Sequence, residues 1–71
     1  MKVLFRDVNK NLCLVDAISI HKSIENPRGI IIQERFHIYT CTDPSLYNEF
    51  NALIQRTAFF ECVNFSNYIF R

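Results

Sequence analysis

The sequence predicts an α+β domain: a small, mostly antiparallel four-stranded sheet, in the order β-β-β-α-β, with one helix packed on one face. Four stretches alternate between apolar and polar residues, as half-buried strands do. A fifth stretch, residues 44–57, repeats its apolar residues with the period of a helix. At 71 residues the chain has room for one core, so residues 1–71 are expected to form a single domain.

The first two predicted strands are joined by a short turn. Residues 2–7 form the first strand, with Val3 and Phe5 on one side. Asn9 and Asn11 favour a turn after it, because Asn tolerates a left-handed backbone. The second strand runs from residue 12 to about residue 24. Its even positions are mostly apolar, whereas its odd positions are mixed in character.

The third predicted strand covers residues 30–41, after a break at residues 26–29. If residues 27–29 form a three-residue loop with Gly29 in the left-handed region, Asn26 faces Ile30. This register brings together three pairs of residues: Ile20 with Phe36, Ile18 with Ile38, and Lys22 with Glu34. The even residues of both strands then form one apolar face, which is expected to lie beneath the helix.

The helix and the last strand complete the predicted fold. Asp43 is a suitable N-cap, and Pro44 suits the first helical position, where its missing N–H costs nothing. The apolar stripe of the helix consists of Leu46, Phe50, Leu53, Ile54 and Thr57. Residues 62–70 alternate again, and a crossover through the helix would place this strand beside and parallel to the first.

Composition excludes several classes of function. The eight basic and seven acidic residues give a net charge of +1, which provides no basic surface for duplex DNA. No apolar run is long enough to cross a membrane, and Arg6 and Asp7 interrupt any signal-peptide core, so a cytoplasmic protein is expected. Three Cys residues without CxxC spacing argue against a disulfide framework and a structural zinc site.

Enzymatic chemistry is not expected either. The predicted register places His21 and His37 on a diagonal, but a stable zinc site needs three or four ligands. Cys41 and His37 are four strand residues apart, about 13 Å, which is too far for a nucleophile and its base. No phosphate-binding, nucleophile-elbow or paired-carboxylate motif is present. The sequence therefore predicts neither a cofactor nor a bound metal.

The uncovered face of the sheet is the predicted functional surface. It would carry five residues: Arg35, His37, Tyr39, Tyr68 and Phe70. Aromatic and Arg side chains around small residues are typical of interface centres. A hydrophobic fraction of 49%, with seven Phe and three Tyr, is high for so small a core, and surplus apolar surface favours protein contact.

The leading hypothesis is a small non-enzymatic cytoplasmic protein, of the kind common among bacterial and phage accessory proteins. It would bind protein, most simply as a homo-oligomer such as a dimer, through the uncovered face or an edge strand. The alternative is single-stranded nucleic-acid binding, because aromatic and basic side chains on a bare sheet can stack and hold bases. Against it, the basic residues are scattered and the signature of the RNA-recognition module is absent.

Overall fold

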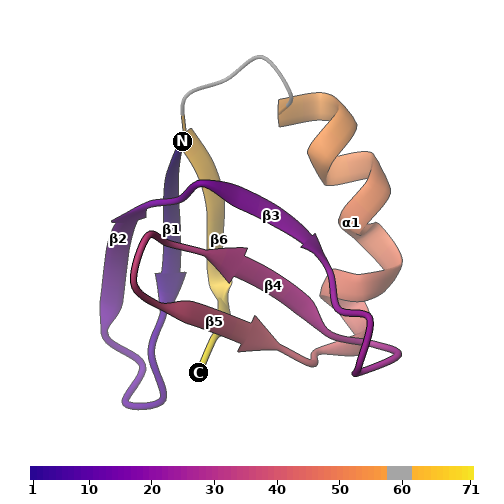
Figure 1. Cartoon of the computed structure of the whole chain (residues 1–71), viewed down its shortest axis with the longest axis horizontal. Helices are drawn as coiled ribbons and strands as arrows, with labels where there is room; N and C mark the ends of the chain where they lie inside the picture. The colour runs from indigo at the N-terminus through magenta and orange to yellow at the C-terminus, as the bar shows by residue number, and fades with distance from the viewer. Residues whose placement is uncertain (58–61) are drawn as a thin grey trace.

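The computed structural model describes residues 1–57 and 62–71, and it contains six strands and one helix (Figure 1). In chain order, the elements are β1 (Lys2–Arg6), β2 (Leu12–Asp16), β3 (Ser19–Lys22), β4 (Ile30–Gln33), β5 (Ile38–Cys41), α1 (Pro44–Thr57) and β6 (Cys62–Ile69). The strands form two three-stranded sheets, β2-β1-β6 and β3-β4-β5. The predicted α+β class is confirmed, whereas the predicted single four-stranded sheet is wrong.

The first sheet contains both ends of the chain. β1 pairs antiparallel with β2 and parallel with β6. The predicted parallel pairing of the first and last strands is therefore confirmed. Val3 and Phe5 of β1 point into the core, where both are almost fully buried. Alternation in a strand then turns Lys2, Leu4 and Arg6 to the opposite face.

The two long predicted strands are each split into two. The predicted strand 12–24 ends at Asp16 and resumes at Ser19 in the other sheet. Between them, the amide of Ala17 donates to the Met1 carbonyl and that of Ile18 donates to the Gln33 carbonyl. The predicted strand 30–41 is interrupted by a turn at residues 34–37, in which the Glu34 amide donates to the His37 carbonyl at 2.8 Å. The chain thus reverses its direction at residues 34–37, three of which are charged or polar.

The predicted register between residues 19–22 and their partners is also wrong. Ile20 lies opposite Ile32 and Lys22 lies opposite Ile30, because the connection between β3 and β4 takes in residues 23–29 and not only 27–29. The Ser23 amide donates to the Gly29 carbonyl and closes this wider loop. Gly29 does not have a positive φ; among the described residues that conformation belongs to Lys10, with φ of 66°.

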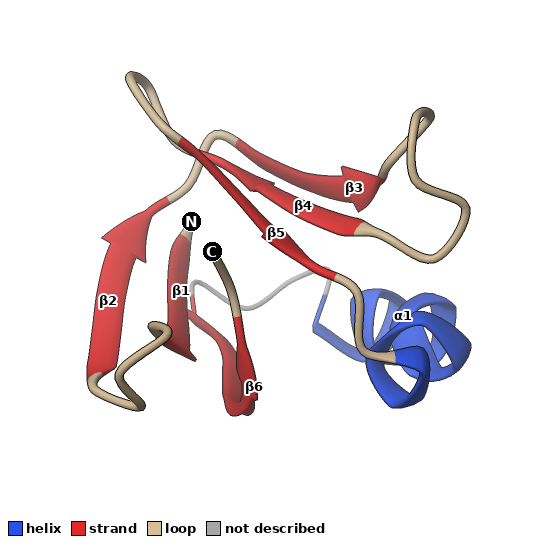
Figure 2. Cartoon of the chain, turned by 90° about the horizontal axis from the view of Figure 1, so that it is seen from below, coloured by secondary structure: helices blue, strands red, loops and turns tan. Residues whose placement is uncertain are grey.

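The helix begins where the sequence predicts, but it does not cover a four-stranded sheet. The β3-β4-β5 sheet forms one layer, and the β2-β1-β6 sheet and α1 lie next to each other in the other layer (Figure 2). Leu46 and Phe50 are buried, and Lys22 Nζ of β3 lies 5.1 Å from the centre of the Tyr47 ring. The side chains of Leu53, Ile54 and Thr57 are outside the described part of the structure.

Backbone hydrogen bonds join the two sheets at the end of the chain. The Phe70 amide donates to the Arg6 carbonyl of the first sheet. Arg71 and Thr40 exchange two bonds, of 2.9 and 3.0 Å, which tie the same segment to β5 of the second sheet. Together with the Ala17–Ile18 corner, these bonds connect the strands into a ring around one core. The buried residues of this core are Val3, Phe5, Ala17, Ile30, Ile32, Cys41, Leu46, Phe50, Val63, Phe65 and Phe70.

Candidate interaction surface

The residues of the predicted functional surface are divided between a turn and the core. Arg35 and His37 are exposed in the β4–β5 turn. Tyr39 instead faces inward from β5, with its ring centre 4.9 Å from that of Phe5. Burial raises the pKa of the Tyr39 hydroxyl, and the nearby Glu34 and Cys13 raise it further. The exposed His37 ring lies against the half-buried Tyr39 ring, with 4.4 Å between the ring centres.

The orientation of β5 is the reverse of the prediction. Because the turn at residues 34–37 contains an even number of residues, Ile32 pairs with Tyr39 and Ile30 pairs with Cys41. Tyr39 and Cys41 thus share the core face with the isoleucines. The two residues expected beneath the helix are in solvent instead: Phe36 is 87% exposed and Ile38 is 56% exposed.

Phe70 and Tyr68, at the other end of the predicted surface, also belong to the core. Phe70 is only 1% exposed and lies between Phe5 and Phe65, at ring distances of 5.4 and 5.9 Å. Tyr68 is half-buried, with its ring edge toward Phe65. The cause is an irregularity in β6, where the pairing with β1 shifts between Leu4 and Arg6. Past this bulge the alternation changes, so that Ile69 points outward and Phe70 inward.

One group of exposed apolar side chains lies on the outer face of the β2-β1-β6 sheet. The strand registers place Leu4 between Leu14 and Asn64, and Arg6 between Leu12 and Ile69. Leu14 is 61% exposed, Leu12 55% and Ile69 41%, and Leu4 is half-buried. We call Leu4, Leu12, Leu14 and Ile69 the apolar patch.

Two charged groups beside the apolar patch, those of Arg6 and Asp16, form hydrogen bonds within the chain. Arg6 donates from Nε to the Ser66 carbonyl and from Nη1 to the Lys10 carbonyl, both at 2.9 Å. Asp16 accepts a hydrogen bond from the N-terminal ammonium of Met1 at 3.0 Å. This bond, together with the charge of that ammonium, lowers the pKa of the Asp16 carboxyl. Asp16 therefore remains ionised at neutral pH.

Sequence reasoning assigned Leu12 and Leu14 to the inner face. β2 is apolar on both sides, because Cys13 and Val15 alternate with the two leucines. Alternation alone cannot orient such a strand. One signal was present: Asp16 shares the face of Leu12 and Leu14, and an unpaired carboxylate is costly to bury.

The two histidines are not brought together. His21 lies on β3, where Nδ1 is 3.4 Å from Ser19 Oγ, whereas His37 lies in the β4–β5 turn. Within residues 1–57 and 62–71, no three His, Cys, Asp or Glu side chains gather as metal ligands would. The cysteines also differ in environment: Cys13 is half-buried, Cys41 buried and Cys62 exposed.

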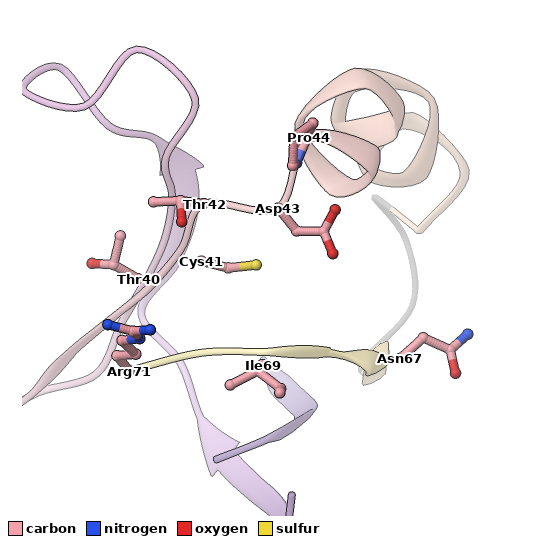
Figure 3. A pocket seen from close by; sticks show the side chains of 8 residues that line it. All are labelled: Thr40, Cys41, Thr42, Asp43, Pro44, Asn67, Ile69 and Arg71. Atoms are coloured by element: carbon pink, nitrogen blue, oxygen red, sulfur yellow. The ribbon is translucent and has the colours of Figure 1, made fainter. Parts of the chain in front are cut away.

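A polar hollow of about 590 Å³ lies between the end of β5, the start of α1 and β6 (Figure 3). The Cys41 thiol and the Asp43 carboxylate point into it. Burial raises the pKa of the Cys41 thiol, although the Asp43 amide donates to its sulfur and acts in the opposite direction. The thiol is therefore protonated at neutral pH, unlike a cysteine activated for nucleophilic attack. Asp43 itself accepts a bond from the Ser45 amide and caps α1.

Comparison with protein-family models, with characterised proteins and with solved structures gave no match to this chain. In the described part of the chain, α1 is too short and too polar to span a bilayer. The role of the outer face of the β2-β1-β6 sheet is therefore inferred from its geometry. This face presents exposed apolar side chains from β2 and β6.

Proposed function

We propose that this chain is a small, non-enzymatic cytoplasmic protein that acts by binding protein, and that it self-associates through the β2-β1-β6 sheet, by the outer face of this sheet or by its open β2 edge. The observation that carries the proposal is the apolar patch. Three of its four side chains are at least 41% exposed, and none of the four belongs to the buried core formed by the described residues. Burying them against another protein surface would remove apolar area from water, at about 25 cal/mol per Å².

The composition of the patch supports protein as the partner. Contact surfaces concentrate apolar side chains at the centre and polar groups at the rim. Here Leu4 and Leu14 are central, while Lys2, Asp16 and Asn64 surround them. Arg6 already uses two of the five N–H donors of its guanidinium on carbonyl oxygens of the chain. These features favour a protein surface over a nucleic acid on this face.

The test is sedimentation velocity over a range of protein concentrations with two matched variants. Leu14→Glu places a charge at the centre of the patch and is expected to weaken self-association at least about thirtyfold, or roughly 2 kcal/mol. Ile24→Glu is the control, because Ile24 is fully exposed in the loop between β3 and β4, away from the patch. It should associate like the parent chain.

A parent chain that stays monomeric at high micromolar concentration contradicts the proposal. The competing class, single-stranded nucleic acid, would use the exposed Arg35, Phe36 and His37 of the β4–β5 turn. Salt-sensitive binding of an oligonucleotide by a monomeric chain would support that class instead.

A further inference from the structure

The outer edge of β2 carries backbone groups with no partner strand. β2 is the terminal strand of its sheet, and in the described part of the chain only β1 pairs with it. Both Figure 1 and Figure 2 show β2 at the margin of the molecule, with nothing beyond it. An open edge next to exposed leucines is a template for another strand.

We propose that two copies of this chain pair through β2, antiparallel and in a register centred on Cys13, to form a continuous six-stranded sheet. This proposal rests on the proposed function and specifies how the self-association takes place. We infer that the partner strand comes from a second copy of this chain, because β2 is complementary to itself in this register. Leu12 of one copy would face Leu14 of the other, and Lys10, which lies in the turn just before β2, would approach Asp16.

Other registers lack this complementarity. If the pairing were centred on Leu14, Leu12 would face the Asp16 carboxylate of the second copy. If it were centred on Leu12, Leu14 would face the Lys10 ammonium. Opposite charges and apolar pairs directly across an antiparallel ladder stabilise it, whereas these mixed pairs do not. Asp16 is free to accept a second cation, because its side chain is 69% exposed although it already binds the N-terminus.

The symmetry of such a pair keeps the apolar surface continuous. A two-fold axis perpendicular to the sheet leaves the outer faces of both copies on the same side. Leu4, Leu12 and Leu14 of the two copies would then adjoin. On the inner side, the β4–β5 turn lies over β2 in both views (Figures 1 and 2), and its Phe36 is 87% exposed. The second copy would therefore also find apolar surface above the paired edges.

Disulfide trapping tests the register directly. In a Cys41→Ala/Cys62→Ser background, Cys13 is the only cysteine. In the proposed register its two copies face each other at the axis, with Cα atoms about 4.5–5.5 Å apart, within disulfide reach. On addition of diamide, each pair of thiols loses two protons and two electrons to the reagent as the S–S bond forms. We expect a covalent dimer on a non-reducing gel.

The position control moves the cysteine by one residue. A variant with Cys13→Ser and Leu14→Cys in the same background should remain uncrosslinked at the same diamide concentration. In this variant the two cysteines would be diagonal neighbours and not opposite each other. Crosslinking at position 14 but not at position 13 would overturn the proposed register.

A charge variant provides a second readout that leaves the core untouched. Lys10→Asp suits the left-handed backbone at this position and places like charges opposite each other. We expect the dimer dissociation constant to rise roughly tenfold. Arg28→Asp, in the β3–β4 loop, makes the same change of net charge and should have no effect.

The outcomes separate this inference from the proposed function. A parent chain that is dimeric in sedimentation, yet neither crosslinks through Cys13 nor responds to Lys10→Asp, overturns the edge pairing and leaves self-association standing. A monomeric parent chain overturns both.

Discussion

At the scale of single residues, burial in this protein follows position and not residue type. Phe36 and Phe70 have the same side chain, but one is 87% exposed and the other 1%. Phe36 is in the turn that reverses the chain between β4 and β5. Phe70 follows the bulge of β6 and fills the space between Phe5 and Phe65. The sequence predicted the opposite environment for both.

This pair gives a matched test of the core. Phe70→Ala is expected to lower the free energy of unfolding by about 3–5 kcal/mol, because it leaves a cavity among aromatic rings. Phe36→Ala removes the same atoms from a solvated turn and is expected to change stability by less than about 0.5 kcal/mol in the monomer. Urea unfolding at low protein concentration measures both values. Equal effects of the two substitutions would contradict the placement of Phe70.

The buried Cys41 thiol makes the free energy of unfolding depend on pH in the alkaline range. Burial raises the pKa of its thiol above the ordinary value of 9.0. As the pH rises past 9.0, the unfolded chain loses a proton that the folded chain still holds, so unfolding becomes more favourable. Stability therefore has its full value below the pKa of the thiol in the unfolded chain, and it decreases as the pH rises above that pKa.

We therefore expect the free energy of unfolding to fall more steeply between about pH 8 and pH 10 in the parent chain than in Cys41→Ala. Tyr39 and Tyr68, whose pKa values burial also raises, contribute equally to both proteins. Parallel pH profiles for the two proteins would show that the Cys41 thiol ionises as readily in the folded state as in the unfolded chain.

At the scale of elements, local sequence signals determined the ends of α1 better than the ends of the strands. Asp43 and Pro44 mark the start of the helix in the sequence, and the Asp43 carboxylate accepts a bond from the Ser45 amide at 2.8 Å. Strand ends have no comparable signal, because backbone partners from distant segments decide where pairing stops. The breaks at Ala17–Ile18 and at residues 34–37 are examples.

Removing the helix cap should be measurable in thermal or urea unfolding. Asp43→Ala is expected to cost about 0.5–2 kcal/mol, since the Ser45 amide loses its acceptor at the helix terminus. Asp43→Asn keeps an acceptor oxygen in the same place and should retain most of the stability. A similar loss in both variants would mean that the negative charge matters more than the hydrogen bond.

At the scale of the whole molecule, the two sheets are expected to unfold together. One corner is the link between β2 and β3 at Ala17 and Ile18. At the other corner, the Phe70 amide bonds to Arg6 of the first sheet, and Arg71 exchanges two hydrogen bonds with Thr40 of the second sheet. Chain ends and corners usually exchange their amide protons early. In this protein, these bonds complete the ring of strands around a single core.

Native-state hydrogen exchange tests this cooperativity. The amides of Thr40, Phe70 and Arg71 are expected to exchange only through opening of the whole domain, as core strands do. The Asn9 amide, which bonds only to the Asp7 side chain in an exposed turn, should exchange far sooner. Rapid exchange of all three corner amides would indicate that the sheets separate before the domain unfolds.

The sequence by itself determined the mixed α+β class, the start of the helix, and the inward orientation of Ile20, Ile30 and Ile32. It allowed the parallel pairing of the first and last strands without deciding it. The tertiary structure decided which side of β2 and β5 faces the core. An apolar residue on each side of a strand permits either orientation. The orientation of β5 depends on the length of the β4–β5 turn, which the bond between the Glu34 amide and the His37 carbonyl closes. The orientation of the end of β6 depends on its bulge, where the pairing with the distant strand β1 shifts. The same pairings leave Leu12 and Leu14 in solvent, and so the location of the candidate contact surface is a property of the fold.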